Sequence, residues 1–113
     1  MVRQQMFELI SAKDVEDYIS QKDTVFVDLR SRREFEEGHI EGAFCLSMEQ
    51  IKSGNYFLAK EYVYVLYCNH GGVSMQAAAL IANGEVLIFT LVGGFEEYEK
   101  FMRSLVDRKQ VKL

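Results

Sequence analysis

The chain has 113 residues, enough for one compact domain and too few for two ordinary ones. Its 13 basic and 17 acidic residues give a net charge of −4, and no basic tract is present. This balance argues against a nucleic-acid partner bound through a cationic face. No apolar run approaches the roughly 20 residues of a membrane span, and residues 1–7 lack the apolar region of a secretory signal. We therefore expect a cytoplasmic protein without a membrane partner.

The cysteine and histidine content limits the metal and redox chemistry of the chain. Its two cysteines, Cys45 and Cys68, make neither a disulfide framework nor a Cys-x-x-Cys pair. Only His39 and His70 carry imidazole groups, so a structural zinc site is not expected. We predict no metal and no cofactor.

The first half of the chain alternates predicted strands with predicted helices. Strands are predicted over residues 7–10, 24–28 and 43–46. Each is followed by a capping box that predicts the start of a helix, at residues 11–14, 31–34 and 47–50. Gly38 and Gly54 are placed to end the second and third of these helices.

The second half continues the alternation. An apolar, β-rich run predicts a buried strand over residues 62–67, and an alanine-rich run predicts a helix over 74–83. A fifth strand follows over 85–90, and Gly93 turns the chain into a last helix. The apolar stripe of that helix is Phe95, Tyr98, Phe101, Met102, Leu105 and Val106, and we expect its aromatic residues to be core. We expect residues 107–113 to be frayed.

Strands that alternate with helices at this spacing predict an α/β fold, a five-stranded and mainly parallel sheet with helices on both faces. We expect one domain over residues 1–113, with its core at about 6–106. In such sheets the ligand site lies beyond the carboxyl ends of the strands. Cys68 and Asp28 each stand at such an end.

Cys68 is the strongest candidate for chemistry, because it stands between a predicted strand and a predicted helix. A glycine-bearing loop follows it, and Ser74 is placed to cap the helix. Backbone N–H groups at a helix start favour an anion, which would make the thiol a nucleophilic thiolate. We expect Gly71 and Gly72 to supply the positive φ angles of the turn. The alternative is a buried cysteine that acts only as a small hydrophobe.

A series of short motifs runs from residue 27 to residue 95: Val-Asp-Leu-Arg at 27–30, Glu34-Phe35, Gly38-His39-Ile40, Gly42-Ala43, Cys68 with Gly71 and Ser74, and Gly93-Gly94-Phe95. In this order and spacing the chain resembles the rhodanese domain. The loop from Cys68 to Ser74 is most similar to the Cys-x-His-Gly-x-x-Ser loop of small bacterial thiosulfate sulfurtransferases.

The resemblance implies a sulfurtransferase with Cys68 as its catalytic residue. The thiolate would take the outer sulfur of a thiosulfate-like anion and pass it, as a persulfide, to a thiol, cyanide or protein acceptor. The substrate would be cradled by the loop residues: Asn69, His70, Gly71, Gly72, Val73 and Ser74. Many rhodaneses carry arginine at the places of Asn69 and Val73, so this loop lacks a fixed positive charge.

Other residues have structural interpretations beside functional ones. We expect Asp28 and Arg30 to be structural residues near the site, joined by charge-assisted hydrogen bonds. His70 either assists an anion or hydrogen-bonds the backbone, and His39 is expected to support the scaffold. Cys45 is expected to be a filler rather than a resolving thiol. We interpret the charged segment 30–37 as a solvated face.

Two alternatives to the sulfurtransferase stay open at this point, and a third is not expected. The first is a persulfide carrier for a partner protein, and the second is a non-catalytic rhodanese-like binding module. The third is a phosphatase of the related Cys-x5-Arg type, which needs an arginine where this chain has Ser74.

Overall fold

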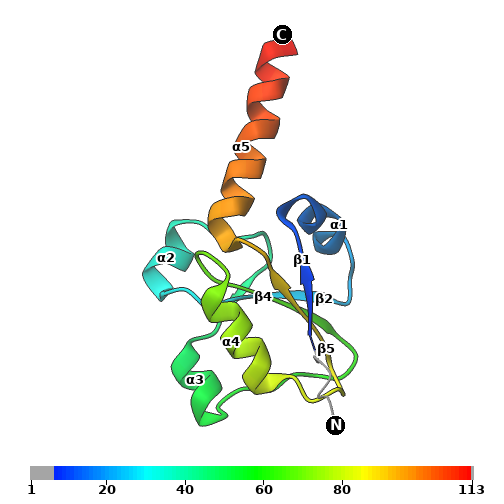
Figure 1. Ribbon diagram of the computed structural model, residues 1–113, viewed down its shortest axis with the longest axis vertical. Coiled ribbons are helices and arrows are strands. Elements are labelled where there is room, and N and C mark those ends of the chain that lie inside the picture. Colours follow the sequence, from blue (N-terminus) through cyan, green and yellow to red (C-terminus); the bar gives the residue numbers. More distant parts are fainter. Residues whose placement is uncertain (1–6, 113) are drawn as a thin grey trace.

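The computed structural model describes residues 7–112, and it contains the predicted α/β fold as one domain. Five parallel strands form one sheet in the order β1-β5-β4-β2-β3 (Figure 1). Their bounds are Glu8–Ile10 for β1, Thr24–Asp28 for β2, Phe44–Cys45 for β3, Val63–Tyr67 for β4 and Leu87–Leu91 for β5. Each hydrogen-bonded pair is parallel, so the "mainly parallel" sheet of the prediction is parallel throughout.

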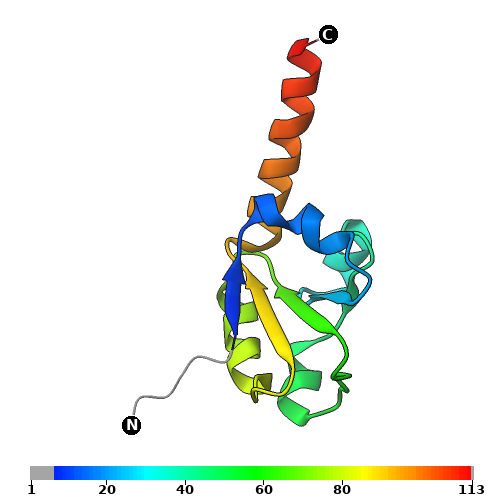
Figure 2. The same ribbon diagram turned by 90° about the vertical axis from the view of Figure 1, so that its right-hand side faces the viewer.

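Helices cover both faces of this sheet (Figures 1 and 2). Their bounds are Ala12–Asp14 for the 3-10 helix η1, Val15–Ile19 for α1, Arg32–Glu37 for α2, Met48–Ser53 for α3, Gly72–Ile81 for α4 and Gly94–Lys112 for α5. One core cluster joins the sheet to α3 and α4 through Ile51, Ala77 and Ile81. The other joins it to α1 and α5 through Val15 and Phe95. No helix within residues 7–112 is long and apolar enough to cross a membrane.

The predicted capping boxes are present in the structure. In α2 the hydroxyl of Ser31 accepts the Glu34 N–H at 3.1 Å, and the Glu34 carboxylate accepts the Ser31 N–H at 3.2 Å. Ser47 and Gln50 make the same reciprocal pair at the start of α3. At η1 the carboxylate of the box accepts the N–H of Ser11. These short-range signals set where the helices begin.

The last helix extends beyond the end of its predicted apolar stripe. It continues to Lys112, and fraying of the tail from residue 107 stays a prediction. Its second half projects away from the domain (Figures 1 and 2), where the sheet offers no packing surface. Phe95 and Tyr98 therefore join the core, whereas Val106 is 52% exposed and is not core.

The strand order places the predicted site at a point where the chain changes direction. From β2 the chain runs outward to β3, and from β4 it runs the other way to β5. The loops after β2 and β4 therefore lead to helices on opposite faces, α2 and α4. The ends of these two neighbouring strands, Asp28 and Tyr67, lie in register. A crevice at such a point is where open α/β sheets bind ligands.

Candidate active site

Cys68 follows the last residue of β4 and is 5% exposed. Its sulfur accepts two backbone hydrogen bonds, from the N–H of Gly71 at 3.1 Å and from the N–H of Ser74 at 3.3 Å. Gly71 lies in the loop just before α4, and Ser74 lies in the first turn of that helix. Two N–H groups aimed at one sulfur favour a negative charge on it, because the electron-poor end of the helix faces the thiol.

The structure corrects the predicted start of α4. The helix begins at Gly72 rather than at Ser74, and its N-cap is Gly71, which has no side chain to cap with. The Ser74 hydroxyl lies inside the first turn, buried, and donates to the Gly71 carbonyl at 3.0 Å. Cys68 Sγ, not the serine hydroxyl, accepts the N–H that an N-cap side chain usually accepts.

The two glycines of the loop have different roles, although both were expected to need positive φ. Gly71 has φ of +106°, and a Cβ there would lie 3.2 Å from the backbone nitrogen of Gly93. Gly72 has no such φ and no atom within 4 Å of its would-be Cβ. The backbone conformation requires glycine at position 71 only, so the expectation of a positive φ at Gly72 is wrong.

Asp28 and Arg30 form a buried pair beside the Cys68 loop. The guanidinium contacts both carboxylate oxygens, with its shortest bond from Nη2 to Oδ2 at 2.8 Å. Nη2 also donates to the carbonyl of Gly38 at 2.6 Å, and the guanidinium stacks over the ring of Phe95 at 4.0 Å. Burial lowers the pKa of Arg30, but the hydrogen bonds and charge of Asp28 outweigh it and hold that pKa above its ordinary value. Arg30 is therefore charged and its charge is balanced.

The Cys68 loop is tied to the start of α5 through the backbone. The carbonyl of Cys68 accepts the N–H of Phe95 at 2.8 Å, and the carbonyl of Asn69 accepts the N–H of Glu96 at 3.1 Å. A Cβ on Gly94 would collide with the backbone carbonyl of Cys68, so the close approach requires glycine there. The loop thus carries the sulfur on one side and caps α5 on the other.

Side chains tie the same loop to α2 and α5. Asn69 Nδ2 donates to Glu34 Oε2 at 2.9 Å, and His70 Nδ1 lies 2.8 Å from Glu96 Oε2. The two hydrogen bonds that the structure gives the Cys68 sulfur come from backbone rather than from His70, whose side chain is 75% exposed.

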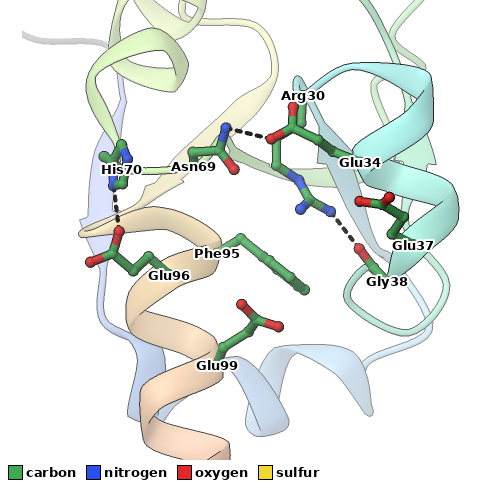
Figure 3. Close-up of a pocket in the computed structure, with 9 residues that line it drawn as sticks. All are labelled: Arg30, Glu34, Glu37, Gly38, Asn69, His70, Phe95, Glu96 and Glu99. Atoms are coloured by element: carbon green, nitrogen blue, oxygen red, sulfur yellow. Dashed lines mark hydrogen bonds and ion pairs between the residues drawn. The ribbon is translucent and has the colours of Figure 1, made fainter.

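Two adjoining cavities open at the Cys68 loop, and the sulfur lines one of them. One, the Cys68 cavity, is lined by Leu29, Arg30, Ser31, Glu34, Cys68, Asn69, His70, Gly72 and Val73. The other, the outer cavity, shares four of these residues and adds further carboxylates (Figure 3). Figure 3 shows the Arg30 guanidinium at its centre, with carboxylates of Glu34, Glu37 and Glu99 around it.

Sequence reasoning missed these carboxylates as parts of the site. Segment 30–37 was interpreted as a solvated face, yet Arg30 and Glu34 line the cavity of the cysteine. Glu96 and Glu99 belong to α5, at least 28 positions after Cys68 in the chain. Glu34 is visible in the sequence as part of the capping box at 31–34, but only the packing of α2 and α5 against the loop brings the charges together.

The two remaining candidates lie outside the Cys68 cavity. His39 is exposed, with Nδ1 2.7 Å from the Phe35 carbonyl and its ring stacked on the Phe35 ring. Cys45 is half-buried on the edge strand β3, where burial raises the pKa of its thiol. It contacts the Arg30 carbonyl at 3.7 Å and lines a different, apolar groove.

With this geometry in view, comparison with known proteins decides the family. The sequence profile described as Rhodanese-like domain matches residues 11–101, most of the chain. The chain belongs to the rhodanese-like domain family. Its relatives include a protein named thiosulfate sulfurtransferase GlpE from Coxiella burnetii, 32% identical over 96 residues that cover 83% of this chain and 89% of the relative.

Solved structures of other proteins share the fold. A rhodanese-related protein from Thermoplasma volcanium superposes with a TM-score of 0.75 at 21% identity, over 84% of this chain and 93% of that one. The protein SSP1007 from Staphylococcus saprophyticus superposes with a TM-score of 0.70 at 28% identity, over 81% of this chain and 93% of that one. The rhodanese-like fold expected from the sequence motifs is thus confirmed.

Proposed function

We propose that this rhodanese-like protein is a sulfurtransferase that carries sulfur as a persulfide on Cys68. The observation that carries the proposal is the pair of N–H groups, from Gly71 and Ser74, that point at the Cys68 sulfur. A thiolate held in this way is a nucleophile, and a persulfide on it would sit in the same cradle.

The proposed reaction has two steps. The Cys68 thiolate attacks the outer sulfur of a donor such as thiosulfate, the sulfur–sulfur bond of the donor breaks, and sulfite leaves with the bonding electrons. A nucleophilic acceptor, either cyanide or a thiol, then takes the outer sulfur and returns Cys68 to the thiolate. The loop residues from Asn69 to Ser74 supply the surroundings of the transferred sulfur, mainly through backbone N–H groups. Asp28 and Arg30 hold the neighbouring loop in place, as a structural pair.

The second candidate is a persulfide carrier, and the lack of a fixed positive charge in the loop is compatible with it. The loop has no fixed positive charge to attract a dianion, so slow loading from thiosulfate is compatible with delivery to a protein partner. A binding module without chemistry does not account for the aimed N–H groups. A phosphatase would need an arginine that binds phosphate through two hydrogen bonds at the position of Ser74. Here the Ser74 hydroxyl donates to the Gly71 carbonyl. A cytoplasmic location stays a prediction.

Formation of thiocyanate from thiosulfate and cyanide tests the enzyme directly. We expect turnover by the wild type and by Cys45→Ser, and none by Cys68→Ser. Turnover by Cys68→Ser would contradict the proposal. A persulfide on Cys68 with negligible thiocyanate would select the carrier instead.

A further inference from the structure

The charges that line the Cys68 cavity do not suit an anion. Two lining residues, Arg30 and Glu34, carry fixed charges. Arg30 is bound through both carboxylate oxygens of Asp28, which is fully buried. Because this pair is neutral as a unit, Arg30 attracts Glu34 only weakly, and the carboxylate of Glu34 leaves a net negative charge next to the sulfur.

Glu34 is held in one position by neutral groups. Oε1 accepts the N–H of Ser31 at 3.2 Å and its hydroxyl at 3.0 Å, and Oε2 accepts Asn69 Nδ2 at 2.9 Å. The hydrogen bond from Asn69, followed by those from Ser31, holds the pKa of Glu34 below its ordinary value. The carboxylate is therefore ionised at neutral pH, and its full negative charge acts on a ligand in the cavity.

The outer cavity adds charges of the same sign. It is lined by Glu37, Glu96 and Glu99 besides Glu34. Two of these face cations on the surface: Arg33 lies 3.6 Å from Glu37, and Lys100 lies 3.3 Å from Glu96. The side chains of both pairs are at least 48% exposed, where water and salt weaken such pairs. His70 adds a positive charge beside Glu96 only when it is protonated.

We propose that Glu34 is a specificity-determining residue of the Cys68 site, and that it selects a thiol acceptor carrying a positive charge over one carrying a negative charge. The inference rests on the proposed function and names the acceptor class. In the selected step the acceptor thiolate attacks the outer sulfur of the Cys68 persulfide. The bond between that sulfur and Sγ breaks, its electron pair stays on Sγ, and the acceptor leaves as a persulfide. A small aminothiol and a thiol beside a lysine or arginine of a protein share this chemistry.

Three thiols with the same two-carbon linker and end groups of different charge test the selection: cysteamine, 2-mercaptoethanol and 3-mercaptopropionate. The protein is first loaded with thiosulfate at high concentration and freed of the donor. Loss of the added sulfur is then followed by intact mass spectrometry. Each thiol has its own intrinsic nucleophilicity, so the measured quantity is the ratio of the cysteamine and 3-mercaptopropionate rate constants, compared between variants.

Glu34→Gln removes the charge and keeps the shape. Gln50 shows that glutamine fills this capping-box place, since its Oε1 accepts the Ser47 N–H at 3.1 Å. We expect the ratio to fall about fivefold at low ionic strength, because the variant loses an attraction for one thiol and a repulsion for the other. Glu99→Gln, an exposed change in the outer cavity, should lower the ratio less. About 0.5 M salt should bring the wild type toward the variant.

Glu61→Gln is the matched control, because it makes the same change in net charge beside the opposite end of the sheet, before β4. We expect it to leave the ratio unchanged. An unchanged ratio in Glu34→Gln, or an equal fall in Glu61→Gln, would overturn the inference and leave the proposed function standing. If thiosulfate loads no sulfur on the wild type, the proposed function fails, and the inference fails with it. A peptide whose cysteine stands beside a lysine, assayed in parallel with cysteamine, separates the two sources: the true acceptor class is the one whose rate constant falls more from the wild type to Glu34→Gln.

Discussion

The sulfur of Cys68 accepts the backbone N–H of Ser74 at 3.3 Å, in the first turn of α4. Because the N-cap residue is Gly71, the thiol occupies the place that a capping side chain takes in other helices. The start of the helix and the reactivity of the sulfur therefore depend on the same contact. A change that moves the first turn of α4 should alter both.

Gly71→Ala tests this dependence. Because Gly71 has φ of +106° and its Cβ would press on Gly93, we expect a loss of about 1–3 kcal/mol in the free energy of unfolding. The Gly71 N–H would also turn from the sulfur, so alkylation of Cys68 by iodoacetamide at about pH 7 should slow several-fold in a Cys45→Ser background. Gly72→Ala is the control, with space for its Cβ and no positive φ. Equal effects of both variants would contradict the assigned geometry.

Val73→Arg should improve the use of thiosulfate. Val73 lines the Cys68 cavity and is 41% exposed, so an arginine there can place a positive charge near a bound dianion without burying it. We expect the KM for thiosulfate to fall by about threefold or more at low salt. Leu80→Arg adds the same charge to the exposed face of the same helix, away from the cavity, and should leave KM unchanged. If both variants lower KM equally, net charge rather than local charge is the cause.

Asp28→Asn should destabilise the fold strongly. The carboxylate is fully buried and accepts the Arg30 backbone N–H at 2.9 Å as well as the guanidinium. The variant leaves the arginine charge buried without its counter-ion, for a loss of about 3–5 kcal/mol in urea unfolding. Asp17→Asn, on the exposed face of α1, should change stability by less than about 0.5 kcal/mol. A loss below about 1 kcal/mol in Asp28→Asn would contradict the structural role of the pair.

Glu34 should contribute a pH-dependent part of the stability. Its pKa in the folded protein lies below the ordinary value of 4.5, chiefly because Asn69 donates to it. The stabilisation of the fold by ionised Glu34 is therefore complete at pH values above 4.5. It is lost as the pH falls through the lower pKa of the folded protein. The difference in urea midpoint between wild type and Glu34→Gln should stay constant from about pH 7 to 5 and shrink below 4.5. A difference that grows in acid would show that the folded pKa is raised.

Local signals in the sequence were enough to predict the strands and the helix starts that define the fold. The capping boxes at Ser31 and Ser47 are examples, since each needs residues only three apart. The position of Cys68 at the end of β4 followed in the same way, because an apolar run ended at Tyr67. The start of α4 did not follow, because the acceptor that caps it is a sulfur six residues before Ser74 rather than a neighbouring hydroxyl.

Features set by packing between distant segments could not be predicted. Glu34 and Glu96 reach the Cys68 loop from helices on either side of it, and their approach depends on how α2 and α5 pack. The buried hydroxyl of Tyr67, which accepts the Ile40 N–H at 3.1 Å, is another such contact, between residues 27 positions apart. The projection of α5 beyond the sheet is a third case, because the apolar stripe at Val106 is the same whether or not a surface covers it.

Intact mass spectrometry after thiosulfate treatment shows directly whether Cys68 is the residue that carries sulfur. We expect the wild type and Cys45→Ser to gain the mass of one sulfur atom, which cyanide then removes. Cys68→Ser should gain none, because Cys45 has no aimed N–H donors among its described contacts and burial raises the pKa of its thiol. Sulfur that loads on Cys68→Ser, or that is absent from the wild type at saturating thiosulfate, would show that Cys68 is not the sulfur carrier.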